Sequence, residues 1–408
     1  MSINAGDTAW ILVSTALVML MTPGVALFYG GMVRQKNVLS TIMMSFAILA
    51  LVGVLWVLFG YSFGFGPDLG GVIGSLDFLG LRGVGQEPSG SYASTVPHLA
   101  FMMFQGMFAI ITVALISGAV VERIKFSSLL VFSALWMALI YAPVAHWVWG
   151  GGWLSDLGML DFAGGIVVHV NAGVSALAVV LLLGPRNGFL KEPMEPHNIP
   201  MVVIGAALLW FGWFGFNAGS TLAANGLAAS AFVATNTSAA AAALTWIFLG
   251  WRQRRPTILG AATGAVAGLA AITPAAGFVS PIAAIPIGVA AAGVCYYTML
   301  FMKSRLGFDD SLDVFAVHGI GGIWGSLALG IFAIASIGGV DGLVTGSFAQ
   351  LGKQFIGVVT VAAFAFTGSW LLGKLVDKTI GLRVKDMEEV VGLDISQHGE
   401  RAYGGLIR

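Results

Sequence analysis

Long stretches without a charged residue divide this chain into segments of membrane-crossing length. Nine stretches contain no Asp, Glu, Lys or Arg and have the roughly 20 residues that one transmembrane helix needs. Lipid cannot hydrogen-bond an unpaired backbone, so a helix is the structure expected for each stretch. The stretches are residues 8–33, 37–67, 88–121, 126–155, 162–185, 196–251, 256–302, 314–340 and 354–373.

Two of these stretches are too long for one crossing. The first is interrupted by NAGSTLAANG (217–226) and the second by TPAAGFVSPIAAIP (273–286), and both sequences are rich in residues that form turns. Dividing them predicts an all-α polytopic membrane protein with eleven transmembrane helices. The predicted boundaries are helices 1–5 at 8–185, helices 6–10 at 199–340, helix 11 at 349–378, a membrane domain over 1–378 and a tail over 379–408.

The composition supports a membrane protein. Hydrophobic residues make up 58% of the chain and charged residues only 9%, whereas soluble domains carry about 25% charged residues. The formal net charge is zero, so there is no electrostatic reason to expect nucleic acid as a partner. The single cysteine, Cys295, excludes an internal disulfide and a cysteine-based metal site.

The basic residues predict the orientation of the chain. Alternate loops and the tail hold 17 of the 19 Lys and Arg residues, and the opposite loops hold only Arg82 and Lys353. Loops rich in Lys and Arg stay in the cytoplasm. An odd number of crossings then places the N-terminus outside and the C-terminus in the cytoplasm.

Two predicted helices share a pattern that suggests an internal repeat. The fifth begins with Asp161 and carries His169 in DFAGGIVVHVNAG, and the tenth begins with Asp313 and carries His318 in DVFAVHGIGG. If helices 1–5 and 6–10 are repeats, the odd number in each places the second upside down relative to the first. Such inverted repeats are a transporter architecture, with the substrate site near the middle of the membrane.

His169 and His318 are the strongest functional candidates among the six histidines. An ionisable residue inside a span is a functional candidate by default, and a buried neutral imidazole needs a partner for its N–H. The two rings could satisfy each other. Alternatively, each could bond a backbone carbonyl without a further role, or both could bind a metal, for which no third ligand is evident. The other four are expected at the membrane interface or the surface: His98, His146, His197 and His398.

Aromatic residues gather near the predicted outer ends of several helices. Residues at such positions commonly form an interfacial belt. Alternatively, their ring faces could attract a small cation, at about 1–2 kcal/mol for each partly desolvated ring. A serine oxygen would then add an acceptor, and Asp161 a nearby negative charge. The residues concerned are Phe104, Phe108, Trp149, Phe216 and Ser220.

The C-terminal tail is the most charged part of the chain. The last 35 residues of the chain, which include this tail, hold 12 of the 38 charged residues. Such a segment can be disordered and solvated. Because apolar residues are interleaved with the charged ones and the end is Gly-rich, docking onto another surface is the other interpretation.

Several long motifs follow one another in order along nearly the whole chain. They are PGVALFYGGMVRQKNVLS, AHWVWGGGWL, DFAGGIVVHVNAG, PHNIPMV, GWFGFNAGS, TPAAGF, DVFAVHGIGGIWG and, in the tail, GLRV, GLD and HGE. Together they resemble the ammonium transporter (Amt/Rh) family, in its bacterial channel type. The resemblance implies eleven helices, an inverted five-helix repeat and a homotrimer with one pore per subunit. It also implies a transporter of the bacterial inner membrane, without a cofactor or a metal, rather than an enzyme.

The resemblance further implies roles for particular residues at the outer side. Phe108, Trp149 and Ser220 would form an ammonium site, with Asp161 behind it as a buried support. Phe108 would stack with Phe216 as a gate below this site.

Below that gate, His169 and His318 would be the twin histidines of the pore. The tail and the cytoplasmic loops would dock a PII-type signalling protein. The remaining residues implied near the pore are Phe104, Trp213 and Thr273.

Selection against potassium suggests a mechanism. Potassium and ammonium are cations of similar size, but only ammonium can donate hydrogen bonds and lose a proton. Moving an intact ion through an apolar pore would cost several kcal/mol. The hypothesis is therefore that ammonium is recruited on the outer side and loses a proton near the gate, and that neutral ammonia passes His169 and His318. Methylammonium is the expected analogue.

Two rival functions stay open. One is a Rhesus-type gas channel for ammonia or carbon dioxide, against which the outer cation site argues. The other is an ammonium sensor, which the short tail without a kinase or cyclase domain disfavours. The outer segment 63–96 matches nothing, and no function is predicted for it.

Overall fold

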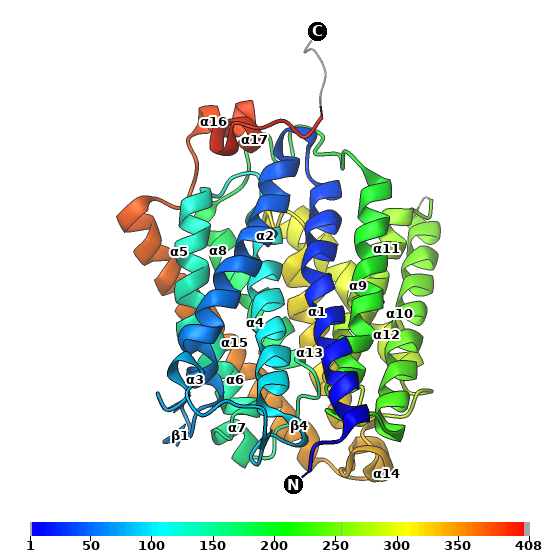
Figure 1. Ribbon diagram of the computed structural model, residues 1–408. Coiled ribbons are helices and arrows are strands. Elements are labelled where there is room, and N and C mark those ends of the chain that lie inside the picture. Colours follow the sequence, from blue (N-terminus) through cyan, green and yellow to red (C-terminus); the bar gives the residue numbers. More distant parts are fainter. Residues whose placement is uncertain (1, 254, 404–408) are drawn as a thin grey trace.

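The computed structural model describes residues 2–253 and 255–403. Long helices run side by side between two ends of a bundle (Figure 1). One end carries α16 (Asp386–Val391) and α17 (Leu393–His398) and is called the tail end. The opposite end, called the hairpin end, carries two short antiparallel hairpins. These pair β1 (Asp68–Leu69) with β2 (Ile73–Gly74), and β3 (Pro88–Ser89) with β4 (Ala93–Pro97).

Successive long helices along the chain run in opposite directions between the two ends (Figure 1). The first half contributes α1 (Ala5–Met32), α2 (Val38–Leu55), α3 (Tyr61–Phe65), α4 (His98–Val120), α5 (Phe126–Trp136), α6 (Ala142–Trp149), α7 (Trp153–Asp156) and α8 (Asn171–Leu183). The second half contributes α9 (Ile199–Gly219), α10 (Gly226–Gln253), α11 (Ile258–Ile272), α12 (Ala284–Phe301), α13 (Ile320–Phe332), α14 (Ala335–Gly338) and α15 (Ala349–Ile380).

Short π-helical segments continue or begin several helices. They are η2 (Trp56–Gly60) between α2 and α3, η4 (Met137–Tyr141) between α5 and α6, η5 (Gly165–Val170) before α8, η6 (Met302–Leu306) after α12 and η7 (Phe315–Gly319) before α13. Within the described residues, ten continuous helical segments are long and apolar enough to cross a membrane, and α11 is a shorter apolar helix of 15 residues. The prediction of a helical polytopic membrane protein is confirmed. The count of eleven crossings and the direction of insertion stay predictions.

Capping residues and turn sequences set the helix boundaries. The side-chain oxygen of Asn4 accepts hydrogen bonds at the start of α1, and Asn198 and Thr257 do the same for α9 and α11, which satisfies amides that have no partner inside a helix. The two predicted interruptions fall where expected. Helix α9 ends before the turn at 217–226 is complete, and α11 and α12 flank the one at 273–286.

At two places a charge-free stretch and its helix have different limits. The stretch 88–121 becomes helical only at His98, because its first ten residues form the β3–β4 hairpin. Helix α15 runs beyond the charge-free stretch 354–373, in agreement with the bounds of 349–378 predicted for helix 11, and includes Lys353 and Lys374. The long side chains of these lysines can reach the polar interface from a helix end. Absence of charge therefore marks burial or contact with lipid, and it does not mark helix ends.

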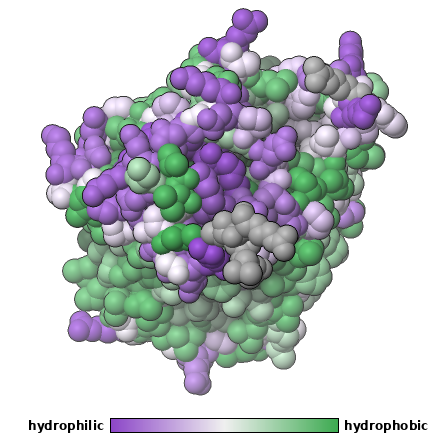
Figure 2. Space-filling view, turned by 90° about the horizontal axis from the view of Figure 1, so that it is seen from above, coloured by the Kyte–Doolittle hydropathy of each residue, from purple (hydrophilic) through white to green (hydrophobic). Residues whose placement is uncertain are grey.

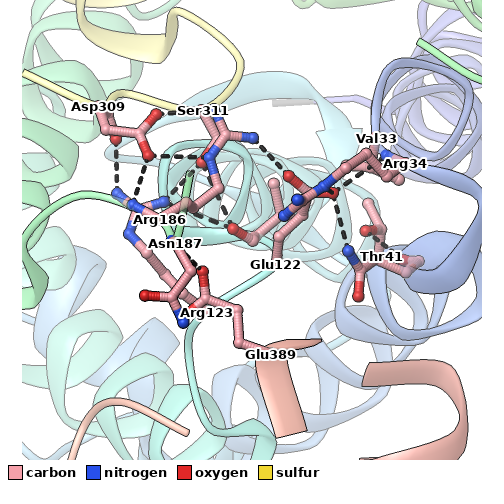
Figure 3. Close-up of polar contacts among 12 residues, drawn as sticks. Val33, Arg34, Thr41, Glu122, Arg123, Arg186, Asn187, Asp309, Ser311 and Glu389 are labelled. Atoms are coloured by element: carbon pink, nitrogen blue, oxygen red, sulfur yellow. Dashed lines mark hydrogen bonds and ion pairs between the residues drawn. The ribbon is translucent and has the colours of Figure 1, made fainter. Parts of the chain in front are cut away.

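A buried ion network joins connecting segments at the tail end (Figure 3). Glu122, only 1% exposed, accepts hydrogen bonds from Arg34 at 2.9 Å and from Arg186. Two nitrogens of Arg186 also bind the carboxylate of Asp309, at 2.7 and 2.9 Å. Burial would raise the pKa of Glu122, but Arg186 and Arg34 hold it below its usual range. Glu122 therefore stabilises the fold at neutral pH, and this contribution is lost as the pH falls through its lowered pKa.

The tail lies against this end of the bundle rather than free of it. Arg383 pairs with Glu389 at 2.7 Å, and Lys36 donates to the Glu389 carbonyl at 2.9 Å. Asp394 accepts a hydrogen bond from the Ser40 amide at 2.8 Å near the start of α2. Polar side chains gather over this end, whereas apolar ones cover the flank (Figure 2). Residues 404–408 of the predicted tail lie outside the described residues, and the division into two domains stays a prediction.

Candidate functional site

A vestibule of about 300 Å³ opens at the hairpin end of the bundle. Aromatic rings make up much of its wall, and four other polar side chains, Ser91, Gln105, Asp161 and Ser220, also line it. Most of these residues come from α4, α6 and the end of α9, so one cavity brings together segments far apart in the sequence. The aromatic residues lining it are Phe65, Tyr92, Phe101, Phe104, Phe108, Trp149 and Phe162.

Two phenylalanines form the floor of the vestibule. The ring centroids of Phe108 and Phe216 are 4.3 Å apart, with their planes inclined by 35°. Phe108 lines the vestibule and Phe216 lines the next cavity, so this pair separates the two. The rings of Phe104 and Trp149 pack nearly at right angles to Phe108, with interplanar angles of 71° and 86° and centroid distances of 4.9 and 5.8 Å. A cation that lies over the face of an aromatic ring is attracted by it.

Below the two rings lies a narrow cavity with two histidines in an otherwise largely apolar wall. His169 Nδ1 and His318 Nδ1 are 3.2 Å apart, and their ring planes are inclined by only 17°. Each side chain is almost fully buried. Two facing nitrogens can form this bond only when one carries a proton and the other accepts it. One Nε2 of the pair is then a donor and the other an acceptor.

Each histidine lies in a π-helical turn, and each turn is held by a buried aspartate of its own. The Asp161 carboxylate accepts four backbone hydrogen bonds, from Gly164, Gly165, Ile166 and Val167, at 2.6–3.0 Å. These are amides of the loop and first turn before α8, which have no helical partner of their own. The carboxylate thus anchors the segment that carries His169.

The corresponding aspartate of the second half is Asp310, not Asp313 as the sequence pattern indicated. Asp310 Oδ2 accepts a hydrogen bond from the Phe315 amide at 2.7 Å, at the start of the segment that carries His318. Asp313 instead pairs with Lys303 at 2.7 Å. Asp310 lies eight residues before His318, the same spacing that separates Asp161 from His169, whereas Asp313 lies only five residues before it and adopts a positive φ of 62°.

Reciprocal glycine contacts set the distance between the two histidine helices. A Cβ on Gly173 would lie 2.2 Å from the Gly319 amide, and one on Gly322 would lie 2.9 Å from the Val170 amide. Each glycine is four residues after one histidine and contacts the residue that follows the other histidine. Two repeats of opposite orientation would produce this pairing. Because no side chain fits between the backbones, the contact holds the imidazoles at bonding distance.

A third cavity, of about 380 Å³, continues from the histidines to the tail end. His318, Tyr29 and Phe28 line both this cavity and the narrow one above it. The Asp313 carboxylate and Arg255 are among its polar lining residues. The vestibule, the narrow cavity and this third cavity therefore follow one path through the bundle, interrupted by the Phe108–Phe216 pair.

Comparison with known sequences decides the family. Residues 9–403 match the Ammonium Transporter Family. The chain belongs to the ammonium transporter family. Ammonium transporter Amt1 of Archaeoglobus fulgidus is 53% identical over 399 residues, which cover 98% of this chain and 99% of that protein. Members of this family are transporters rather than enzymes, and ammonium transport is the function that the comparison supports.

Solved structures of the family have the same fold. Candida albicans Mep2 superposes with a TM-score of 0.90 at 36% identity, covering 98% of this chain and 90% of that one. A structure described as a sensor Amt protein also gives a TM-score of 0.90, at 30% identity, with coverage of 96% and 98%.

Most of the residues expected at the ammonium transporter site lie along the path. Trp149 and Ser220 line the vestibule, and Trp213 stacks on His169 with centroids 5.4 Å apart. Phe104 lies in the vestibule rather than in the narrow cavity. Thr273 is fully buried and lines none of the three cavities; it accepts a hydrogen bond from Trp213 Nε1 at 2.8 Å. Its contact with the path is therefore indirect.

Other features of the site could not be read from the sequence. His98 and His146, expected at an interface or surface, are buried, with exposures of 6% and 0%. Gln105 and Tyr92 line the vestibule without having been singled out. Among the described residues there is no cluster of three or more His, Cys, Asp or Glu side chains that could hold a metal, so a metal site gains no support.

Proposed function

We propose that this protein recruits ammonium in the vestibule, removes a proton near the Phe108–Phe216 gate and conducts ammonia past His169 and His318 toward the tail end. The observation that carries the proposal is the hydrogen-bonded imidazole pair inside a narrow apolar cavity. An intact cation there would lose its hydration at a cost of several kcal/mol. Neutral ammonia avoids most of that cost, and the free Nε2 atoms offer it one donor and one acceptor.

Uptake of radiolabelled methylammonium into proteoliposomes tests the main proposal. Uptake that saturates, and that unlabelled ammonium inhibits while potassium does not, is the expected result. Equal inhibition by potassium would contradict proton loss as the basis of selectivity. A protein that binds methylammonium without transporting it would instead favour the sensor function, which the likeness to the sensor Amt structure keeps as a second candidate.

The charge distribution supports the proposed orientation, with the hairpin end outside a bacterial inner membrane and the tail end in the cytoplasm. We also propose a homotrimer, as the family resemblance implies. Asn236 is exposed on α10, within a membrane-spanning segment. Lipid cannot satisfy its amide, which favours a protein neighbour on that face. Native mass spectrometry of the detergent-solubilised protein would reveal a monomer if this proposal is wrong.

Replacing Trp149 with leucine should weaken recruitment without unfolding the protein. The indole forms one wall of the vestibule beside Phe108, and a partly desolvated ring contributes about 1–2 kcal/mol to cation binding. The apparent KM for methylammonium should therefore rise by about tenfold, while the melting temperature changes little. Trp251, an exposed tryptophan of α10, is the matched control. Unchanged transport in Trp149→Leu would leave the interfacial belt as the better interpretation.

The docked tail leads to a prediction about regulation. We propose that a PII-type protein binds the tail end under nitrogen sufficiency, as the family resemblance implies. Glu389, 2% exposed, holds the tail by accepting hydrogen bonds from Arg383 and the Asn187 amide. Glu389→Ala should release the tail and reduce copurification of the regulator as strongly as deletion of residues 384–408.

Asp386→Ala, at an exposed position of the same helix, is the matched control and should leave regulator binding intact. Membrane insertion should be normal in all three variants, because every candidate span of the described chain ends before residue 384. Full copurification of the regulator with the deletion variant would show that the tail is not part of the binding surface.

A further inference from the structure

The outer segment 63–96, for which the sequence predicted no function, lies against the end of α6 at the hairpin end (Figure 1). Trp149 is the last residue of α6. Four of the residues that flank Trp149 bond to this segment, two on its N-terminal side and two on its C-terminal side. The four are His146, Trp147, Gly150 and Trp153.

On the N-terminal side, His146 is completely buried and its ring bridges two parts of the outer segment. Nδ1 lies 3.0 Å from the Gly64 carbonyl and Nε2 lies 2.8 Å from the Asp68 carboxylate. Asp68 also accepts from the Gly71 amide at 2.8 Å, which fixes the turn between β1 and β2. Trp147 Nε1 donates to the Val72 carbonyl in that turn at 2.8 Å.

On the C-terminal side, the chain after Trp149 is held in the same way. The Trp153 amide donates to the Gly71 carbonyl at 3.1 Å, and the Tyr92 hydroxyl lies 3.3 Å from the Gly150 carbonyl. The backbones approach so closely that a Cβ on Gly150 would lie 2.1 Å from the Gly64 carbonyl oxygen. Only glycine fits there, so the close packing of the two backbones requires a glycine at position 150.

These contacts fix the backbone on both sides of Trp149. The indole itself makes one hydrogen bond, from Nε1 to the Asp161 carbonyl at 2.8 Å, and its position otherwise follows that of the end of α6. Tyr92 connects the outer segment to the vestibule directly, because its ring lines the vestibule beside Trp149. Asp68 does not line the vestibule, so its contact with the vestibule runs through His146 and the end of α6.

We infer that Asp68 is a positioning residue for Trp149, and that the outer segment, through its contacts on both sides of Trp149, acts as a clasp that sets the affinity of the vestibule for its cation. This inference rests on the proposed function, since it needs Trp149 to contact the substrate. The attraction of a cation to a ring depends on the ion lying over the ring face within about 6 Å of its centre. A small rotation of the end of α6 would therefore lower affinity while leaving the histidine pair unchanged.

Asp68→Ala, assayed by methylammonium uptake in proteoliposomes, tests the clasp. The apparent KM should rise by about fivefold, and the maximal rate should stay within about twofold of that of the natural protein. Asp68→Asn keeps an acceptor oxygen for His146 and should recover part of the affinity. Asp77→Ala is the matched control, because the contact of Asp77 is with Ser75 inside the outer segment. Its apparent KM should be unchanged.

A double-substitution cycle separates positioning from a general structural effect. If Asp68 acts through Trp149, adding Asp68→Ala to Trp149→Leu should change the apparent KM by less than about 1.5-fold, since coupled residues do not act additively. A further fivefold rise in the double variant would overturn the clasp. So would an Asp68→Ala protein with the natural KM. A failure of the proposed function differs from both, because Trp149→Leu alone would then leave the KM unchanged.

Discussion

Alanine in place of His169 or His318 is expected to abolish either ammonium conduction or the exclusion of potassium. The two rings share one hydrogen bond in a narrow cavity. Removal of one leaves the other with an unpaired buried nitrogen, at about 1–3 kcal/mol, and opens space that water can enter. Hydration of the cavity would lower the barrier to an intact cation. We therefore expect either a loss of ammonium current of about tenfold or more, or a potassium current that the natural protein lacks.

Currents from ammonium and potassium in proteoliposomes distinguish these outcomes. Glutamate at either position keeps a titratable group and should be milder than alanine. His197→Ala is the control, because His197 bonds the Val33 carbonyl at the tail end and lines none of the three cavities. Full ammonium current with intact potassium exclusion in both alanine variants would assign the pair a packing role only.

Asp161→Ala is expected to prevent recovery of folded protein. The carboxylate is 7% exposed and accepts four backbone hydrogen bonds. Each amide left without a partner costs about 1–3 kcal/mol, and the sum is comparable with the 5–15 kcal/mol of stability typical of a folded protein. Asp161→Asn retains one acceptor oxygen but turns its NH₂ group toward donors, so an intermediate loss is expected.

Size-exclusion profiles after solubilisation, together with melting temperatures, measure this effect. Asp156→Ala, at an exposed aspartate of the neighbouring α7, should behave like the natural protein. If Asp161→Ala instead melts normally and only binds methylammonium more weakly, the carboxylate acts through its charge on the substrate and not as an anchor.

The distribution of charge predicted most of the fold because each crossing is a local property. A span needs about 20 residues without charge, and the sequence 217–226 signals a turn by its own composition. The intramembrane histidines were likewise visible locally, since an ionisable side chain within a span is rare. Their pairing was predicted as a possibility from the needs of the imidazole N–H.

Other parts of the site depend on contacts between distant segments. The bond between Thr273 and Trp213, and the burial of His146 under the outer segment, join residues 60 or more positions apart. No local pattern specifies such contacts. Asp310 could have been found from the sequence, because it lies eight residues before His318 just as Asp161 lies eight residues before His169, and the structure shows that it bonds the turn.

The reciprocal contact between the two histidine helices has a consequence for biogenesis. His169 is separated from its partner by 149 positions, so the first half of the chain enters the membrane long before its counterpart is synthesised. During that interval the backbone groove at Gly173 lacks the chain that fills it, and an imidazole stands without a partner in a largely apolar setting. The hydrogen-bonded histidine pair can therefore form only after the segment that carries His318 has been synthesised. A chain arrested before that point would keep His169 without its partner.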